Sequence, residues 1–378
     1  MQYPFTRIPP YDAQAIHDTI ERALAGARLD TTSGPMREVS DTIRRALAVP
    51  PASGGEVIDV PARVVDGETA AATLPPAAGG WLSHEYRNAA GVRAYRVHLP
   101  AAAASAPRPM LVMMHGCTQT PEDFAAGTRM NRLADEHGFI VVYPEQAAQA
   151  NPSRCWNWFQ AQDQRRDAGE PSLIAGIVRE VAQRHDVDPG RIYVAGLSAG
   201  GAMAVVLGES YPELFAGVGV HSGLPYASAH DIPSAMAAMK GGRGGLSRAA
   251  SPRVGAAAVS GAAKRAVPTI VFHGDRDHTV RETNAQEIVR QTVEAHQAQA
   301  GGPQLQTVIE EGTAAGGRRY TRTTYREPAG TPRIEFWSLH GAGHAWSGGD
   351  LSGSYTEANG PDASAEMARF FLALPRLD

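Results

Sequence analysis

The chain has 378 residues, a formal net charge of −4 at pH 7 and a hydrophobic fraction of 43%. A chain of this length can bury a sizeable core, and its small net charge gives no electrostatic case for binding nucleic acid or an anionic membrane. The sequence contains no apolar run of about 18 residues, so we expect no membrane span.

Residues 1–80 predict a helical and linker extension. The segments Ala13–Ala25 and Met36–Ala48 read as short amphipathic helices, and Gly34-Pro35 separates them. Pro50–Gly80 is rich in proline, alanine and glycine, which is typical of an irregular linker.

Residues 81–378 alternate predicted strands with predicted helices, a pattern typical of a mostly parallel central sheet with helices on both faces. The segment Trp81–Leu99 predicts an antiparallel hairpin that turns at Asn88–Gly91. The other predicted strands are Pro109–Met114, Phe139–Tyr143, Ile192–Val194, Ala216–Val220, Thr269–Phe272 and Ile334–Leu339. The predicted helices are Leu173–Val187, Ala202–Glu209 and Ala363–Leu374.

The sequence Gly196-Leu197-Ser198-Ala199-Gly200 matches the G-x-S-x-G pattern of a nucleophilic serine. A β-branched and aromatic run precedes it and a helix-favouring run follows, so Ser198 is predicted to lie where a strand turns sharply into a helix. Backbone N–H groups at such a helix N-terminus point at developing negative charge. We therefore predict that Ser198 is a nucleophile, against the alternative that five loosely specified residues match by chance.

A serine nucleophile needs a base and an acid that orients the base, and in α/β-hydrolases the chain order is Ser, then Asp or Glu, then His. Asp275 and Asp277 follow one predicted strand, and His344 lies in the glycine-containing loop after the last one. We predict His344 as the base. His340 comes directly off its strand and His115 precedes the nucleophile, so we expect both to be structural.

The remaining part that a serine site of this kind needs is an oxyanion hole. The apolar run Pro109–Met114 predicts a strand buried on both faces, and His115-Gly116-Cys117 follows it. In this fold one donor comes from the early strand-to-helix loop and the other from the residue after the nucleophile. We predict the Cys117 and Ala199 N–H groups as these donors, with Gly116 allowing the close backbone approach.

The sequence has two cysteines, Cys117 and Cys155, each beside a motif. They could pair if both loops cover the site, or remain free thiols, which a reducing cytosol favours.

Met1–Pro10 lacks the charged start and apolar centre of a signal peptide, so we expect a cytoplasmic chain, or a secreted one if a leader has been removed. No cysteine–histidine spacing predicts a metal site.

The segment 225–266 has many alanines and glycines and little periodicity. It follows the strand after the nucleophile helix. A long segment of this kind is either a lid insertion over the site or a disordered surface insertion.

Five runs together resemble the poly(3-hydroxybutyrate) depolymerase family of esterases, which neighbours the feruloyl and acetylxylan esterases. They are His115–Gln119, Asn151–Phe159, Gly196–Gly201, His273–Asp277 and Gly343–Gly349. The resemblance covers about Tyr86–Leu374 and implies an α/β-hydrolase fold with a Ser198-Asp277-His344 triad, no metal and no diffusible cofactor. Its H-G-x-x-D pattern places the acid on Asp277 rather than Asp275.

Trp156, Trp158 and Trp346 lie in the matching loops and could form flat apolar walls for the substrate, or belong to the core. The expected function is a serine esterase acting on short hydroxyacyl esters or polyester oligomers of the polyhydroxybutyrate type, with a small-molecule or oligomeric ester as its partner. The alternatives are a feruloyl or acetylxylan esterase and a non-catalytic binding protein of the same fold. Acyl length and oligomeric state stay open.

Overall fold

The computed structural model describes residues 80–102, 105–241, 265–299 and 304–377. The predicted helices Ala13–Ala25 and Met36–Ala48, and nearly all of the predicted linker, lie outside the described residues. So does 242–264, the larger part of the predicted lid insertion. The predictions for these segments stay predictions.

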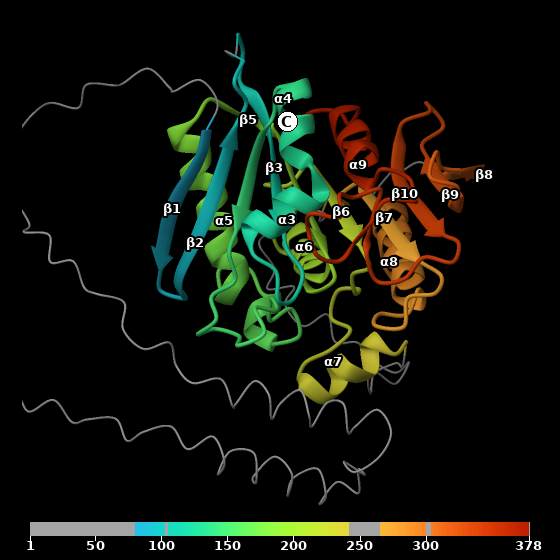
Figure 1. Cartoon of the computed structure of the whole chain (residues 1–378), viewed down its shortest axis with the longest axis horizontal. Helices are drawn as coiled ribbons and strands as arrows, with labels where there is room; N and C mark the ends of the chain where they lie inside the picture. The colour runs from blue at the N-terminus through green and yellow to red at the C-terminus, as the bar shows by residue number, and fades with distance from the viewer. Residues whose placement is uncertain (1–79, 103–104, 242–264, 300–303, 378) are drawn as a thin grey trace, which may run out of the picture. The chain divides into compact units, whose positions relative to one another are not determined.

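A ten-stranded sheet forms the centre of the described structure, in the order β1-β2-β4-β3-β5-β6-β7-β10-β9-β8 (Figure 1). Its strands are β1 (Gly80–Asn88), β2 (Gly91–Leu99), β3 (Arg108–Met114), β4 (Ile140–Pro144), β5 (Val187–Leu197), β6 (Gly217–His221), β7 (Thr269–Gly274), β8 (Gln306–Thr313), β9 (Arg319–Arg326) and β10 (Pro332–Leu339). Strands β4, β3, β5, β6, β7 and β10 pair in parallel, and an antiparallel hairpin flanks them at each side. The predicted α/β-hydrolase architecture, a mostly parallel sheet with helices on both faces, is confirmed.

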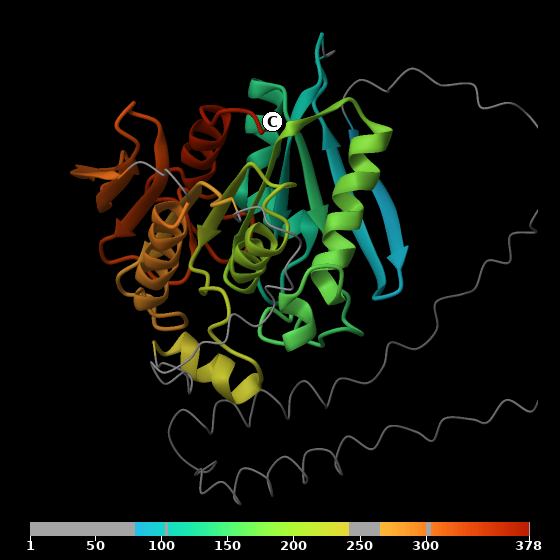
Figure 2. The same cartoon turned by 180° about the vertical axis from the view of Figure 1, so that it is seen from behind.

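Helices cover both faces of this sheet. The helices of the described residues are α3 (Pro121–Thr128), α4 (Met130–His137), α5 (Gly169–Arg184), α6 (Ala199–Ser210), α7 (Ile232–Met239), α8 (Thr283–Gln297) and α9 (Ala363–Leu372). A short 3-10 helix, η1 (Ala161–Gln164), and a separate strand pair, β11 (Trp346–Ser347) and β12 (Thr356–Glu357), complete the described elements. Helices α3, α4 and α9 lie on the face turned to the viewer in Figure 1, and α5, α6 and α8 on the face turned to the viewer in Figure 2.

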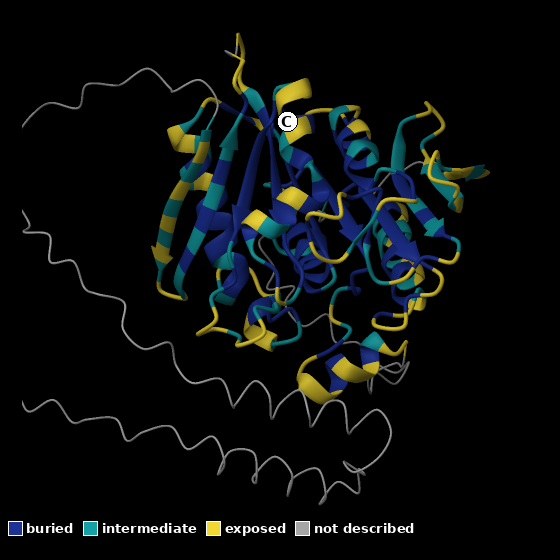
Figure 3. Cartoon of the chain, viewed as in Figure 1, coloured by how far each residue is buried: buried dark blue, intermediate teal, exposed yellow. Residues whose placement is uncertain are grey.

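The buried apolar residues form two clusters, one on each face of the sheet. Along β3, Met110, Val112 and Met114 pack with α5 and α6, while Leu111 and Met113 pack with α4 and α9. This explains why the strand is a continuous apolar run instead of an alternating one. Figure 3 shows the same burial across the central strands, with exposed residues on helix α7, on the outer faces of other helices and in the loops.

Some element bounds differ from the sequence-based expectation. The crossover helix α5 ends at Arg184 and not at Val187, because Val187 already begins β5. The hairpin β8–β9 was not predicted, since its strands are mostly polar and half exposed. Helix α7 was missed too; Asp231 caps it by accepting a hydrogen bond from the Ser234 N–H (2.8 Å).

The parallel arrangement brings the candidate site residues to one edge of the sheet. Groups that follow β3, β5, β6, β7 and β10 all emerge at the carboxyl ends of parallel strands, which is where catalytic groups collect in open α/β sheets. Helix α7 also lies beyond these strand ends in both views (Figures 1 and 2).

Candidate active site

The turn between β5 and α6 holds Ser198 in a strained backbone conformation. Its dihedral angles are φ 56° and ψ −119°, and α6 begins at the next residue. A non-glycine residue at positive φ costs of order 1–3 kcal/mol and persists only where the surroundings over-determine it. Here the Ser198 N–H donates to the backbone oxygen of His221 at the end of β6 (2.9 Å).

Two glycines make this turn possible because the backbone passes very close to its neighbours. A Cβ atom at Gly200 would lie 2.1 Å from the Met114 carbonyl oxygen, and one at Gly196 would lie 2.5 Å from the Gly200 oxygen. Neither position can hold a side chain without moving main chain, so the spacing of the glycines follows from the approach of α6 to β3 and β5.

The structure brings Asp277 and His344 together. The Nδ1 atom of His344 lies 2.6 Å from Oδ2 of Asp277, and Oδ1 of Asp277 accepts hydrogen bonds from the N–H groups of Thr279 (2.9 Å) and Val280 (2.8 Å). Burial alone would raise the pKa of Asp277, but the hydrogen bond from His344 and that from Val280 outweigh it, so the pKa lies below its usual value. An ionised Asp277 accepts a hydrogen bond from the Nδ1–H group of His344, which keeps the proton on Nδ1 and leaves Nε2 free to accept a proton.

Asp275 pairs with the other histidine of this region. Its carboxylate contacts His340 Nδ1 (3.2 Å) and accepts from the Gly341 N–H (2.7 Å), while His340 Nε2 lies 2.9 Å from the Thr321 hydroxyl. His115 is fully buried; its Nε2 accepts from the Gln146 N–H (3.1 Å), its Nδ1 lies 2.7 Å from the Gly116 oxygen, and burial lowers its pKa to about 4. Both histidines have the structural surroundings that were expected for them.

His221 is a residue of this site that sequence reasoning missed. Its carbonyl accepts from Ser198 N–H, its Nε2 accepts from Ser347 N–H (3.0 Å), and its ring stacks on Trp346. Through these contacts it joins the turn of the nucleophile to the loop of His344. The available signal was its position, because it follows the predicted strand Ala216–Val220 at the edge where the other site residues lie.

The candidate oxyanion donors lie on two facing segments. Ala199 is the first residue of α6, and the first N–H groups of a helix have no partner within it. In the loop after β3, the N–H groups on both sides of Cys117 are used within the protein: Gly116 donates to Gln119 Oε1 (2.9 Å) and Thr118 to the Ser153 oxygen (2.7 Å). These two bonds fix the direction of the peptide groups around Cys117.

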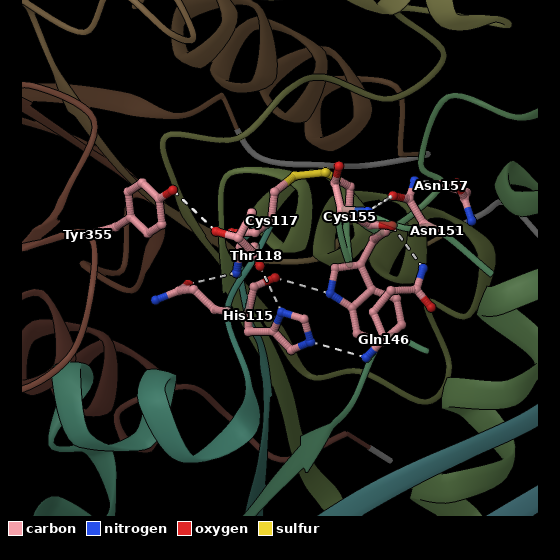
Figure 4. Close-up of a disulfide and its surroundings, with 12 residues drawn as sticks. His115, Cys117, Thr118, Gln146, Asn151, Cys155, Asn157 and Tyr355 are labelled. Atoms are coloured by element: carbon pink, nitrogen blue, oxygen red, sulfur yellow. Dashed lines mark hydrogen bonds between the residues drawn. A yellow bond between two sulfur atoms is a disulfide. The ribbon is translucent and has the colours of Figure 1, made fainter. Parts of the chain in front are cut away.

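A disulfide joins Cys117 to Cys155, which resolves the question that the sequence left open. Figure 4 shows the bridge lying across the top of the loop pair, with His115 and Gln146 below it. Gln146 Nε2 donates to the Cys155 oxygen (2.9 Å), and Trp156 Nε1 donates to the His115 oxygen (3.1 Å). The bridge and these bonds tie the two loops into one unit.

The buried Glu170 supports this unit from below. Its carboxylate accepts from Asn157 N (2.8 Å) and Asn157 Nδ2 (2.9 Å), forms an ion pair with Arg93 (3.1 Å) and contacts Gln146 Nε2. Burial, helped by the nearby Asp163 charge, raises the pKa of Glu170 above its usual value. The ion pair with Arg93 and the hydrogen bonds offset part of the cost of burying this carboxylate.

The tryptophans that could have formed substrate walls are core residues instead. Trp156 and Trp346 are 0% exposed and Trp158 is 6% exposed. Trp346 packs edge-on against Phe124 and over His221. Their side chains therefore support the loops of the site and present no face to solvent, and of the two interpretations the core one holds in this structure.

Within the residues that the structure describes, no group of three or more histidine, cysteine or acidic side chains could hold a metal ion. No helix among the described residues is long and apolar enough to cross a membrane.

Comparison with known proteins gives a consistent set of relatives. The family model described as "Esterase PHB depolymerase" matches residues 93–302. Poly(3-hydroxyalkanoate) depolymerase C of Paucimonas lemoignei is 34% identical over 260 residues, which are 65% of this chain and 57% of that protein. Poly(3-hydroxybutyrate) depolymerase of Ralstonia pickettii is 29% identical over 311 residues, 76% of this chain and 59% of that protein. The matches thus span less than two thirds of the length of these relatives.

Feruloyl esterase B of Neurospora crassa is 34% identical over 141 residues, which are 37% of this chain and 47% of that protein. Among solved structures, an acetyl xylan esterase from Aspergillus awamori superposes with a TM-score of 0.56 at 19% identity, over 74% of this chain and 94% of that one. At this identity the likeness supports the fold alone.

Proposed function

The chain belongs to the esterase PHB depolymerase family, and from this premise we propose that it is a carboxylic ester hydrolase that works through a serine acyl-enzyme. The observation that carries the proposal is the 2.6 Å contact between His344 and the ionised Asp277, at the same sheet edge as the strained Ser198. We propose Ser198, His344 and Asp277 as nucleophile, base and orienting acid.

The proposed reaction uses only groups of this chain and water. His344 Nε2 takes the hydroxyl proton of Ser198 as its oxygen attacks the ester carbonyl, and Asp277 stabilises the imidazolium that forms. The Ala199 and Cys117 N–H groups bind the oxyanion. His344 then gives the proton to the departing alcohol. Water repeats the sequence on the acyl-enzyme: His344 accepts its proton, the carboxylic acid leaves, and the proton returns to Ser198.

For the substrate we propose short hydroxyacyl esters or polyester oligomers. Support comes from the two depolymerase relatives, which match a larger share of this chain than the feruloyl esterase does. The test is side-by-side turnover of 3-hydroxybutyrate oligomers, feruloyl esters and acetylated xylan. A higher kcat/KM on the oligomers supports the proposal, a preference for feruloyl or acetyl esters reassigns the substrate, and no turnover above background of any ester, p-nitrophenyl butyrate included, leaves a binding protein.

We also propose that the protein works in an oxidising compartment. The Cys117–Cys155 bond is the supporting observation, because disulfides persist where thiols are not kept reduced. This favours the secreted alternative over the cytoplasmic one. Fractionation of the producing cells with an antibody against the chain tests it, and retention in the cytosol with free thiols contradicts it.

A further inference from the structure

Tyr355 connects the two loops that border the proposed reaction centre. Its backbone oxygen accepts from the N–H of Trp346, two residues after His344, over 2.7 Å. Its hydroxyl lies 3.2 Å from the hydroxyl of Thr118, the residue after Cys117. The Thr118 hydroxyl donates its own proton to the Cys117 oxygen (2.6 Å), so Tyr355 is the donor in the contact between the two side chains (Figure 4).

Both partners of this contact lie in left-handed backbone conformations. The φ angle is 66° at Thr118 and 52° at Tyr355. For a β-branched or bulky residue such an angle is a genuine outlier, and a glycine would adopt it without strain. Side chains that are kept at strained positions cluster at active sites and ligand clamps. Ser198 shares this feature, so the two strained positions make Thr118 and Tyr355 candidates for a role at the same site.

Several hydrogen bonds hold the loop around Tyr355 in place. The Asp123 carboxylate accepts from the Ser354 N–H (2.8 Å), Gln119 Nε2 donates to the Ser354 oxygen (3.0 Å), and Thr356 Oγ1 donates to the Gly353 oxygen (2.9 Å). A side chain held on such a loop loses little conformational freedom when it binds a ligand.

Tyr355 is nevertheless 47% exposed; among the described residues, Trp81 (37%) on β1 is the other aromatic residue that counts as exposed. Its hydroxyl is engaged with Thr118, which leaves the ring as the part of the side chain that could contact a ligand. An exposed aromatic ring beside polar catalytic loops is suited to the aliphatic part of a bound molecule.

We propose that Tyr355 is a specificity-determining residue whose ring supports the part of an ester chain that extends beyond the scissile bond, on the Thr118 side of the oxyanion loop. The ligand class is a linear aliphatic hydroxyacyl oligomer. This inference rests on the proposed ester hydrolase function, and it adds a preference for chains longer than the single unit that the reaction centre itself contacts.

The test measures kcat/KM for p-nitrophenyl acetate and for soluble 3-hydroxybutyrate oligomers from dimer to pentamer. The variants are Tyr355→Ala, which removes the ring, and Tyr355→Phe, which keeps the ring and removes the hydroxyl. Ile309→Ala is the matched control, because Ile309 is a 66% exposed apolar residue on β8, at the end of the sheet. Thermal melting confirms that each variant is folded.

In the wild type, kcat/KM is expected to rise with oligomer length. Tyr355→Ala should lower kcat/KM for the pentamer about five- to tenfold more than for p-nitrophenyl acetate, the scale of a partly lost aromatic contact. Tyr355→Phe should keep most of the length preference and Ile309→Ala all of it.

Three results overturn the inference: a wild type with no length preference, a Tyr355→Ala variant that loses equally on all substrates, or a Tyr355→Phe variant that matches Tyr355→Ala. If the wild type hydrolyses neither acetate nor oligomers, the proposed function itself fails. If the wild type hydrolyses p-nitrophenyl acetate but shows no preference for longer oligomers, the proposed role of Tyr355 fails and the ester hydrolase function stands.

Discussion

His221 accepts hydrogen bonds from both Ser198 and Ser347, the first through its carbonyl oxygen (2.9 Å) and the second through Nε2 (3.0 Å). One buried residue thus fixes the distance between the turn of the nucleophile and the loop of the base. Burial lowers the pKa of His221 to about 3, so its ring is neutral at ordinary pH and its Nε2 stays an acceptor. The relationship makes His221 a positioning residue of the proposed mechanism.

Loss of the Nε2 acceptor should therefore impair the chemical step. We expect His221→Leu to lower kcat about tenfold or more while KM changes by less than about threefold, since small misplacements of catalytic groups are costly. His221→Gln, whose side-chain oxygen can accept from the Ser347 N–H, should recover part of this loss. Steady-state kinetics on p-nitrophenyl butyrate check the split, and a glutamine variant no better than the leucine variant would assign His221 to packing.

The proposed triad predicts a second set of kinetic effects. Ser198→Ala, His344→Ala and Asp277→Asn should each lower kcat by several orders of magnitude and leave the melting temperature little changed. The combined effects should fall far below the product of the single ones, because the three groups act as a unit. Asp275→Asn is the control, since Asp275 pairs with His340. A larger loss from Asp275→Asn than from Asp277→Asn would show that the acid is misassigned.

Labelling gives an independent check on the nucleophile. An organophosphonate should modify Ser198 in the wild type. It should modify the His344→Ala variant more slowly. Mass spectrometry that finds the label on another residue contradicts the assignment.

The disulfide predicts a redox dependence. Reduction, or Cys155→Ser, should lower kcat more than it raises KM, because the bridge holds the loop of Cys117, the proposed oxyanion donor, and such contacts strengthen in the transition state. Thiol titration of the denatured protein should find free thiols only after treatment with a reductant. Two free thiols before reduction would refute the bond and leave the esterase mechanism standing.

Buried histidines predict that stability falls in mild acid. Burial lowers the pKa of His115 and of His296 to about 4 and that of His221 to about 3. These values lie below about 6.5, the value of an unfolded histidine, so only the unfolded chain binds these protons at intermediate pH. Stability is therefore lost as pH falls from about 6.5 to 4, and each histidine contributes a slope of about 1.4 kcal/mol per pH unit.

His296 offers a clean test of this slope. It lies on α8, away from the proposed site, and its buried Nε2 has no hydrogen-bond partner among the described residues. His296→Leu should leave kcat unchanged and reduce the loss of unfolding free energy between pH 7 and pH 5, as measured by urea titration at each pH. An unchanged slope would show that His296 is charged or solvated in the folded protein.

The sequence predicts the site better than its surroundings. Ser198 and Asp277 follow strands with continuous apolar runs and His344 follows the last predicted strand, so chain order places all three at one edge of the sheet, while the choice of Asp277 over Asp275 needs the family pattern. The positioning role of His221 was not predicted, because it depends on a hydrogen bond to Ser347, which lies 126 residues further along the chain. The sequence left the role of the tryptophans open, because a motif does not show whether a side chain is buried. Trp346 is buried beneath its loop because it packs against Phe124 and His221, and this packing depends on the fold.

The hairpin β8–β9 illustrates a different failure. The polar strand β8 lacks the apolar alternation that predicts a sheet, because it lies at the end of the sheet where little of it is covered.

The polarity of β8 has a further consequence for the edge of the sheet. As the last strand of the described sheet, β8 offers unpaired backbone groups to any strand that meets it, and such edges are starting points for aggregation. Glu310 and Glu311 place acidic side chains along this edge, with Arg322 and Arg319 of β9 behind them. Charged side chains along an edge strand disfavour pairing with a second strand, so we expect the ion-paired β8 edge to resist strand addition from a second copy of the chain.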